Sequence, residues 1–137
     1  MKSLRESLLK ENVSTSKIKK ALKDVEGFLR DKKVEKELSK KFDPELVKVF
    51  LDWYIKDRLW DDEMIQFMSE ETEPGESIIS WITIDIGDTD GCIDFFDEYI
   101  EDEYSEKYDE WAEVDRDLVW AVSDLVDNNF KGYKYTR

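Results

Sequence analysis

The stretch from residue 85 to residue 111, DIGDTDGCIDFFDEYIEDEYSEKYDEW, holds the side chains best suited to chemistry, because carboxylates occupy nearly every second position. Carboxylate oxygens can bind a hard cation such as Ca²⁺. A dense row of negative charge can also attract a basic partner, as the phosphates of a nucleic acid do. The third interpretation is the ordinary solvated face of a helix.

The beginning of this stretch is close to an EF-hand calcium loop. Such a loop needs oxygen ligands at positions 1, 3 and 5, glycine at position 6 and a bidentate Glu at position 12. With Gly91 at position 6, Asp88 and Asp90 take positions 3 and 5. Position 1 is then Ile86, which has no ligand oxygen, and position 12 is the shorter Asp97. We therefore predict no metal ligands and no cofactor here, and expect the segment to cap the following helix.

Histidine is absent from the chain, and Cys92 is the single cysteine. These counts exclude Ser/His and Cys/His nucleophilic catalysis, and also zinc sites built from His or from several Cys. No motif singles out a catalytic pair of carboxylates, so the sequence predicts a protein that is not an enzyme. The lone cysteine also agrees with a reducing compartment.

The acids after residue 90 are dense enough to compare with a phosphate backbone. Residues 90–110 hold ten acids in 21 residues, which on one straight helix of about 32 Å is one charge per roughly 3 Å. A single DNA strand carries one phosphate per ~3.4 Å. A solvated face is the more frequent cause of such a row and stays open as the alternative. The predicted partner-binding residues are Asp94, Asp97, Glu98, Glu101, Asp102, Glu106, Asp109 and Glu110.

Charge is divided unevenly along the chain. Residues 1–60 have a net charge of +5 and residues 61–137 a net charge of −19. From Asp61 to Asp115 the acids are interrupted by a single cation, Lys107. This pattern predicts a basic protein partner for the second half, which should not bind nucleic acid directly. The Lys-rich segment 17–41 suits either nucleic-acid binding or docking against the acidic half of the same chain.

Apolar spacing predicts helices over residues 16–30, 44–60 and 61–69, and from residue 90 onward one long helix or two helices broken near Ser105. A last helix begins at Val114 and ends at NNFKG, where Asn129 or Gly132 can supply the C-terminal turn. Asp43 and Pro44 form the clearest helix start. The Lys-rich stretch up to Lys41 is either a further short helix or a connector. The alternating isoleucines of residues 78–87 favour a strand over a helix, with GYKYT at 132–136 as its possible mate.

These elements predict a mainly α fold, a single small helical domain with at most a short two-stranded β element. We expect a leader or short helix over residues 1–14 and one acidic helical domain over residues 15–137. The sequence has no apolar run of transmembrane length and no secretory signal, so it predicts a cytoplasmic protein that does not enter a membrane.

The first eleven residues, MKSLRESLLKE, resemble the capsid-targeting leaders of internal head proteins in T4-type phages. Those leaders begin Met-Lys-Ser/Thr and end in an apolar-X-Glu cleavage site, which Leu9-Lys10-Glu11 would supply. The resemblance ends there and leaves the rest of the chain unassigned; an ordinary amphipathic helix is the alternative. It implies a protein that is packaged in a virion or delivered to a host cell.

Together these features predict an acidic protein-binding module, in the sharpest form a phage-type inhibitor that mimics nucleic acid and blocks the basic channel of a host nucleic-acid enzyme. A toxin-neutralising immunity protein is one alternative, because such proteins are also small and acidic. A carboxylate metal-binding protein is the other.

Overall fold

The structure is a computed structural model that describes residues 14–73, 77–87, 92 and 94–131, and all the regular structure in these ranges is helical. The mainly α fold is therefore confirmed. The helices are α2 (Thr15–Leu29), α3 (Lys32–Leu38), α4 (Pro44–Tyr54), the π-helix η1 (Ile55–Leu59), α5 (Asp62–Glu71), α6 (Ile79–Gly87), α7 (Asp94–Glu103), the 3₁₀-helix η3 (Ser105–Lys107), α8 (Tyr108–Ala112) and α9 (Asp115–Asn129).

Side-chain caps set the starts of α2, α3 and α4. Ser14 accepts a hydrogen bond from the backbone N–H of Lys17 at the start of α2. Asp31 caps α3 and Asp43 caps α4, each through its Oδ1 atom. Because the first N–H groups of a helix lack partners within the helix, these carboxylates and hydroxyls satisfy them. The Lys-rich stretch up to Lys41 thus contains a further short helix, α3, and the start of α4 at Pro44 is as predicted.

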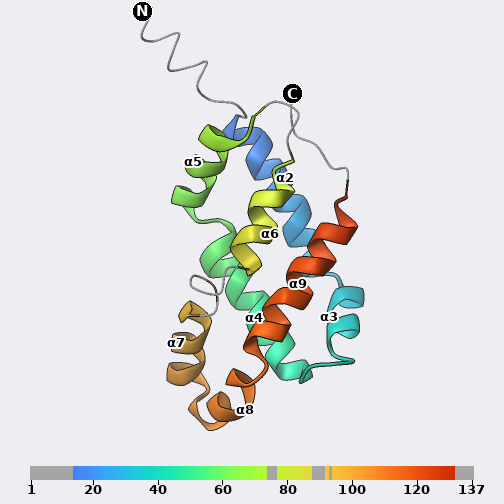
Figure 1. Ribbon diagram of the computed structural model, residues 1–137, viewed down its shortest axis with the longest axis vertical. Coiled ribbons are helices and arrows are strands. Elements are labelled where there is room, and N and C mark those ends of the chain that lie inside the picture. The colour runs from blue at the N-terminus through green and yellow to red at the C-terminus, as the bar shows by residue number, and fades with distance from the viewer. Residues whose placement is uncertain (1–13, 74–76, 88–91, 93, 132–137) are drawn as a thin grey trace, which may run out of the picture.

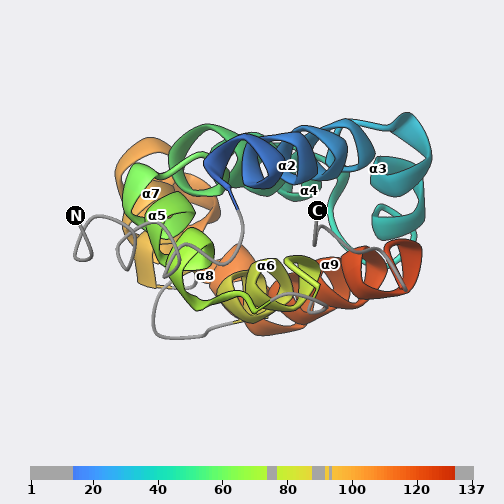
Figure 2. The ribbon, with the colours of Figure 1, turned by 90° about the horizontal axis from the view of Figure 1, so that it is seen from above.

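The helices form two layers. Figure 2 shows α2, α3 and α4 in one layer and α6 and α9 in the other. Helix α6 packs along α9, and α3 contacts α9 where the layers meet at one end. Helix α5 lies against α2, whereas α7 and α8 lie at the opposite end of the molecule's long axis (Figure 1).

The strand predicted over residues 78–87 is wrong, because residues 79–87 form helix α6. Ile78, Ile82 and Ile86 are spaced four residues apart, and all three are buried. Burying one such side chain stabilises the fold by roughly 1.5–3 kcal/mol, which exceeds the ~1 kcal/mol range of strand propensities. Ile84, which the alternation would have placed with them, is 61% exposed. The proposed mate, residues 132–136, lies outside the described residues.

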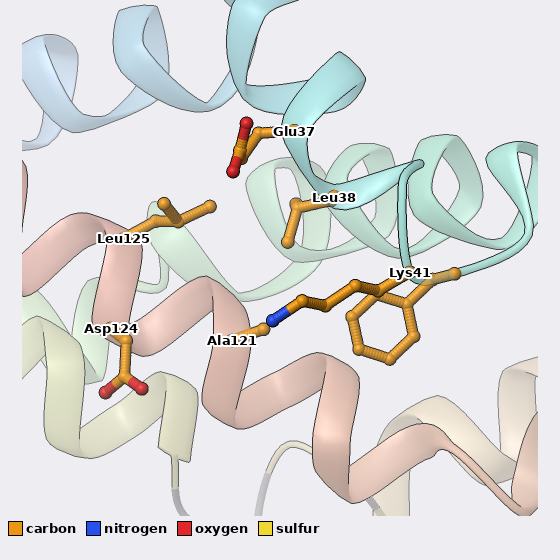
Figure 3. A pocket seen from close by; sticks show the side chains of 7 residues that line it. Glu37, Leu38, Lys41, Ala121, Asp124 and Leu125 are labelled. Atoms are coloured by element: carbon orange, nitrogen blue, oxygen red, sulfur yellow. The ribbon is translucent and has the colours of Figure 1, made fainter.

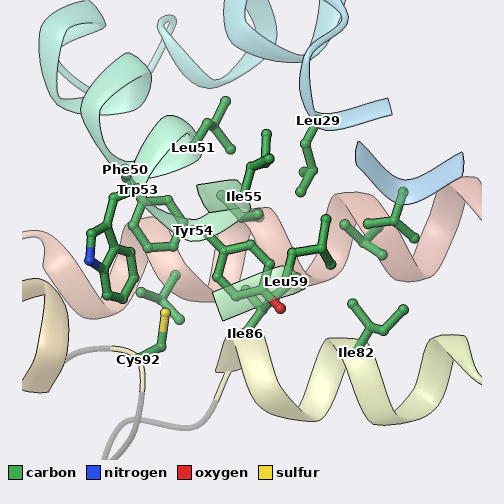
Figure 4. Close-up of a cluster of buried hydrophobic side chains, with 14 of the residues drawn as sticks. Leu29, Phe50, Leu51, Trp53, Tyr54, Ile55, Leu59, Ile82, Ile86 and Cys92 are labelled. Atoms are coloured by element: carbon green, nitrogen blue, oxygen red, sulfur yellow. The ribbon is translucent and has the colours of Figure 1, made fainter. Parts of the chain in front are cut away.

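The core lies between the two layers. Phe50 and Tyr54 from α4 and Leu59 from η1 meet Ile82 and Ile86 from α6 (Figure 4). The predicted helix from Pro44 to Trp60 therefore exists as an α-helix followed by a π-helical turn, and it is the central core element, as expected from its wide apolar face.

A charged contact joins the layers beside this core. The Arg58 Nη2 atom lies 2.5 Å from Asp85 Oδ1, and the Tyr54 hydroxyl donates to Asp85 Oδ2 over 2.9 Å. The side chains of Arg58 and Asp85 are only 21% and 11% exposed. Burial, followed by the charge of Asp85, raises the pKa of Tyr54 well above 10. The phenol is therefore a neutral donor at neutral pH.

Other ion pairs lie within the N-terminal half, where Glu26 pairs with Arg30, Glu37 with Lys40 and Asp52 with Lys56. These pairs therefore do not join the Lys-rich segment 17–41 to the acidic half of the chain.

Residues 1–13 lie outside the described residues, so the structure does not test the prediction of a leader or short helix there. No helix in the described part of the chain is long and apolar enough to cross a membrane.

Glu26 gives a testable pH dependence. Hydrogen bonds from Arg30 and then from Trp60, whose Nε1 atom lies 2.7 Å from Glu26 Oε1, hold the pKa of Glu26 below its ordinary 4.5. A carboxyl whose pKa is lower in the folded state stabilises the fold above the unfolded pKa, and this contribution disappears as pH falls through the folded pKa. Glu26→Gln should cost about 0.5–1.5 kcal/mol at pH 7 and less below pH 4, measured by urea unfolding. Glu37→Gln, at an exposed pair, is the control and should cost under about 0.5 kcal/mol.

Candidate functional site

The acidic segment does not form one straight helix. Helix α7 ends at Glu103, Tyr104 leaves the helical region with φ −136° and ψ 46°, and the chain continues as η3 and α8. Helices α7 and α8 contact each other, so the chain turns back on itself (Figure 1). The prediction of two helices broken near Ser105 is confirmed, and the single-helix alternative is wrong. The acids thus surround a corner, and the length estimate for a straight row does not apply.

Aromatic residues hold this corner on the body of the protein. Ile100 and Trp111 are buried, at 2% and 1% exposed. The Tyr104 ring lies 6.0 Å from the Tyr99 ring and 5.5 Å from the Trp111 ring, measured between centroids. Trp111 Nε1 also lies 3.4 Å from Oδ2 of Asp43, the residue that caps α4. The apolar seam found in the sequence is therefore the attachment of the acidic corner to the core.

The predicted site residues occupy three elements of this corner. Asp94 is the first residue of α7, and Asp97 is partly buried. The other six, which are Glu98, Glu101, Asp102, Glu106, Asp109 and Glu110, are exposed. None of these six forms a salt bridge with another described residue. Their charges are therefore free for contact with another molecule. We call the exposed acids of α7, η3 and α8 the acidic corner.

The turn between α7 and α8 concentrates charge around Tyr108. The pKa of Tyr108 is raised above 10, first by the charge of Asp97, then by desolvation, and further by the charges of Glu101, Asp115 and Asp109. These acids come from α7, α8 and the start of α9. Acids distant in sequence are thus brought together, and a cation approaching this side of the corner meets several charges at once.

Two acids of the N-terminal half lie near α7, and the sequence did not indicate them. Asp52 is paired with Lys56, so Asp57 is the one that adds to the acidic corner. The pKa of Tyr99 on α7 is raised by burial, then by Tyr104, and then by Glu103, Asp52 and Asp57. Asp52 and Asp57 belong to α4 and η1, which therefore lie near α7. Apolar periodicity shows which face of α7 is buried but not which helix receives it, so this proximity had no signal in the sequence.

A shallow depression lies at the bend. It has a volume of about 310 Å³ and is lined by Glu45, Glu103, Tyr104, Ser105, Glu106 and Lys107. Three carboxylates face a single ammonium group there. The depression therefore suits a lysine or arginine side chain of a partner better than an anion.

The metal interpretation gains no support from the described residues, among which no three Asp, Glu or Cys side chains are placed to hold a metal ion. Ile86, at the first ligand position of the calcium-loop alignment, is fully buried at the end of α6. Residues 88–91, which hold positions 3 to 6 of this alignment, lie outside the described residues.

Comparison with known proteins adds no family: no family model, no curated protein and no solved structure matches this chain. The acidic corner is therefore interpreted from its own geometry.

Proposed function

We propose that the chain is a protein-binding module whose acidic corner docks on a basic groove of another protein. The partner we favour is a nucleic-acid enzyme, because its groove is built to receive closely spaced negative charges. The observation that carries the proposal is the set of six exposed acids without salt bridges to other described residues. The leader-like residues 1–11, if they act as in phage head proteins, would fit delivery of such an inhibitor to a host.

The distribution of charge supports a use in binding. Like charges placed close together destabilise the folded state by repulsion. Here Asp97, Glu101, Asp109 and Asp115 all act on one tyrosine, Tyr108. A cationic surface that covers the two exposed acids of this set, Glu101 and Asp109, relieves part of the repulsion, and this relief adds to the free energy of binding. Electrostatic attraction also accelerates association and makes it sensitive to salt.

The bent shape favours a groove over a flat surface. Acids on α7 and α8 come from two helices that contact each other, and Glu45 of α4 and Asp57 of η1 add charge beside them. A concave basic channel can contact several sides of such a corner, whereas a flat surface meets one side. The proposal therefore predicts competition with the channel's own nucleic acid.

A charge-reversal experiment tests the proposal. The triple variant Glu98→Lys, Glu101→Lys, Asp102→Lys is expected to lose at least about 100-fold in affinity for a partner recovered from bacterial lysate, since about three charge contacts of roughly 1 kcal/mol are removed. Surface plasmon resonance from 50 mM to 500 mM salt should show weaker wild-type binding at high salt, and added DNA or RNA should compete.

The matched control reverses three exposed acids on α5 and near the end of α9, namely Glu63, Glu71 and Asp127. It changes net charge by the same amount away from the acidic corner, so its affinity should stay within about 10-fold of the wild-type value, because such distant charges are screened by salt. Equal losses in both triple variants would mean that net charge alone matters. A partner that no nucleic acid displaces would favour the immunity-protein alternative.

A further inference from the structure

A second surface feature, separate from the acidic corner, lies between α3 and α9. Two adjoining depressions share the side chains of Lys41, Phe42, Ala121 and Asp124. The first, of about 200 Å³, also includes Glu37, Leu38 and Leu125, and Figure 3 shows these side chains converging from the two helices. The second, of about 420 Å³, extends along α9 to Val114, Asp117 and Trp120. We call the two together the α3–α9 groove.

The floor of this groove is apolar. Leu38 is buried, and Phe42, Ala121 and Leu125 are partly buried beside it. Trp120 is 48% exposed, whereas Leu118, Val119 and Val122 of the same helix are fully buried in the core. The exposed tryptophan is therefore not used by the core of the described protein. Tryptophan is among the residues that contribute most binding energy at protein interfaces.

The rim of the groove is acidic. Asp117 and Asp124 are two turns apart on α9, about 10.5 Å along the helix axis, with Trp120 and Ala121 between them. Neither aspartate forms a salt bridge with another residue in the described ranges. Glu37 pairs with Lys40 on the opposite side. Lys41 also lines both depressions, so the groove presents an apolar strip with two aspartates along its α9 side and a single lysine facing them.

Size and charge together indicate the occupant. The smaller depression is below the roughly 300–1,000 Å³ of pockets that enclose small-molecule ligands, but it can receive a single side chain. The larger depression, of about 420 Å³, falls within that range and extends along α9 to Val114. The two aspartates match cations separated by about two helical turns. An amphipathic helix presents side chains at this spacing, with an apolar residue between the cations.

We propose that the α3–α9 groove docks a basic amphipathic helix of a partner protein, with one bulky apolar side chain against Trp120 and Phe42 and with Lys or Arg residues opposite Asp117 and Asp124. This surface is independent of the acidic corner, and its occupant needs an apolar side chain, which the acidic corner does not require.

A displayed library of random sixteen-residue peptides is the probe, selected on the full wild-type chain. Enriched peptides are expected to carry a Leu, Phe or Trp with Lys or Arg three or four residues to each side. As synthetic peptides they should lose at least about 30-fold in affinity with Trp120→Ser and at least about 10-fold with Asp117→Asn, Asp124→Asn. Phe67→Ser is the matched control, because Phe67 is 43% exposed on the distant α5 and its loss should leave binding unchanged.

Circular dichroism shows whether each variant is folded. The Trp120→Ser variant should fold, because Trp120 is exposed and lies outside the core. The triple variant Glu98→Lys, Glu101→Lys, Asp102→Lys should still bind the peptides. The proposal for the α3–α9 groove and the proposal for the acidic corner can therefore fail separately. The proposal is overturned if no peptide is enriched, if the enriched peptides are acidic or neutral, or if Trp120→Ser binds them as the wild type does. It is also overturned if sedimentation shows a dimer that Trp120→Ser abolishes, because a second copy then fills the groove.

Discussion

Asp85→Ala is expected to lower the free energy of unfolding by about 3–5 kcal/mol, because it leaves the Arg58 charge in the protein without its carboxylate. Both side chains are mostly shielded from water, and the contact joins η1 to α6 across the two layers. The Tyr54 hydroxyl loses its acceptor in the same change. Urea unfolding followed by circular dichroism measures the loss.

The compensating double variant separates the cost of an orphaned charge from the value of the pair. Arg58→Met with Asp85→Leu removes both charges and keeps apolar volume, but it leaves the buried Tyr54 hydroxyl without its acceptor. It should therefore cost about 1–3 kcal/mol, less than Asp85→Ala. Tyr54→Phe removes one hydrogen bond and should cost about 0.5–1.5 kcal/mol. A loss below about 1 kcal/mol for Asp85→Ala would show that water reaches Arg58 freely, contrary to its burial.

Local chemistry could be predicted from the sequence, since its causes lie within a few residues of each other. Asp43 and Pro44 specify the start of α4 through a hydrogen bond to Glu45 N–H and a fixed φ angle. The end of α9 near Asn129 likewise follows from the last apolar residues of its period. The break after Tyr104 was one of two alternatives, because the apolar seam continues across it.

Errors arose where two structures satisfy the same pattern. Ile82, Ile84 and Ile86 alternate with Thr83 and Asp85, whereas Ile78, Ile82 and Ile86 recur every four residues. The segment therefore fits both a strand and a helix. What decides for a helix is the partner α9, whose buried valines face these isoleucines, and no local signal contains that information. Asp85 shows the same limit: it belonged to a predicted strand, and its contact with Arg58 depends on the packing of α6.

The sequence predicted which acids of the acidic corner are exposed, but not which other helices lie beside them. The exposure of Glu98, Glu101 and Asp102 follows from the helical period, because Ile100 must face the core. The nearness of Asp52 and Asp57 to α7, and the α3–α9 groove around Trp120, depend on tertiary packing. Periodicity assigned Trp120 no surface role.

Trp111→Ala is expected to have the largest effect on the acidic corner although it changes no charge. Replacing a buried aromatic residue with alanine costs about 3–5 kcal/mol. Trp111 contacts Tyr104 and approaches Asp43, so its loss should release α7, η3 and α8 from the body first. Hydrogen exchange should therefore rise in α7 and α8 more than in α6 and α9. Trp111→Phe keeps an aromatic side chain and is the control, with a cost of about 1–2 kcal/mol.

The same variant tests whether the geometry of the acids matters for binding. If the acidic corner binds as a preformed surface, binding to Trp111→Ala must also order α7 and α8, which costs conformational entropy. Affinity for the basic partner should therefore fall about 10- to 100-fold. Its salt dependence should remain that of the wild type, because the exposed acids of α7, η3 and α8 are all still present. Unchanged affinity with faster exchange would instead mean that charge density alone attracts the partner, and that Trp111 serves only stability.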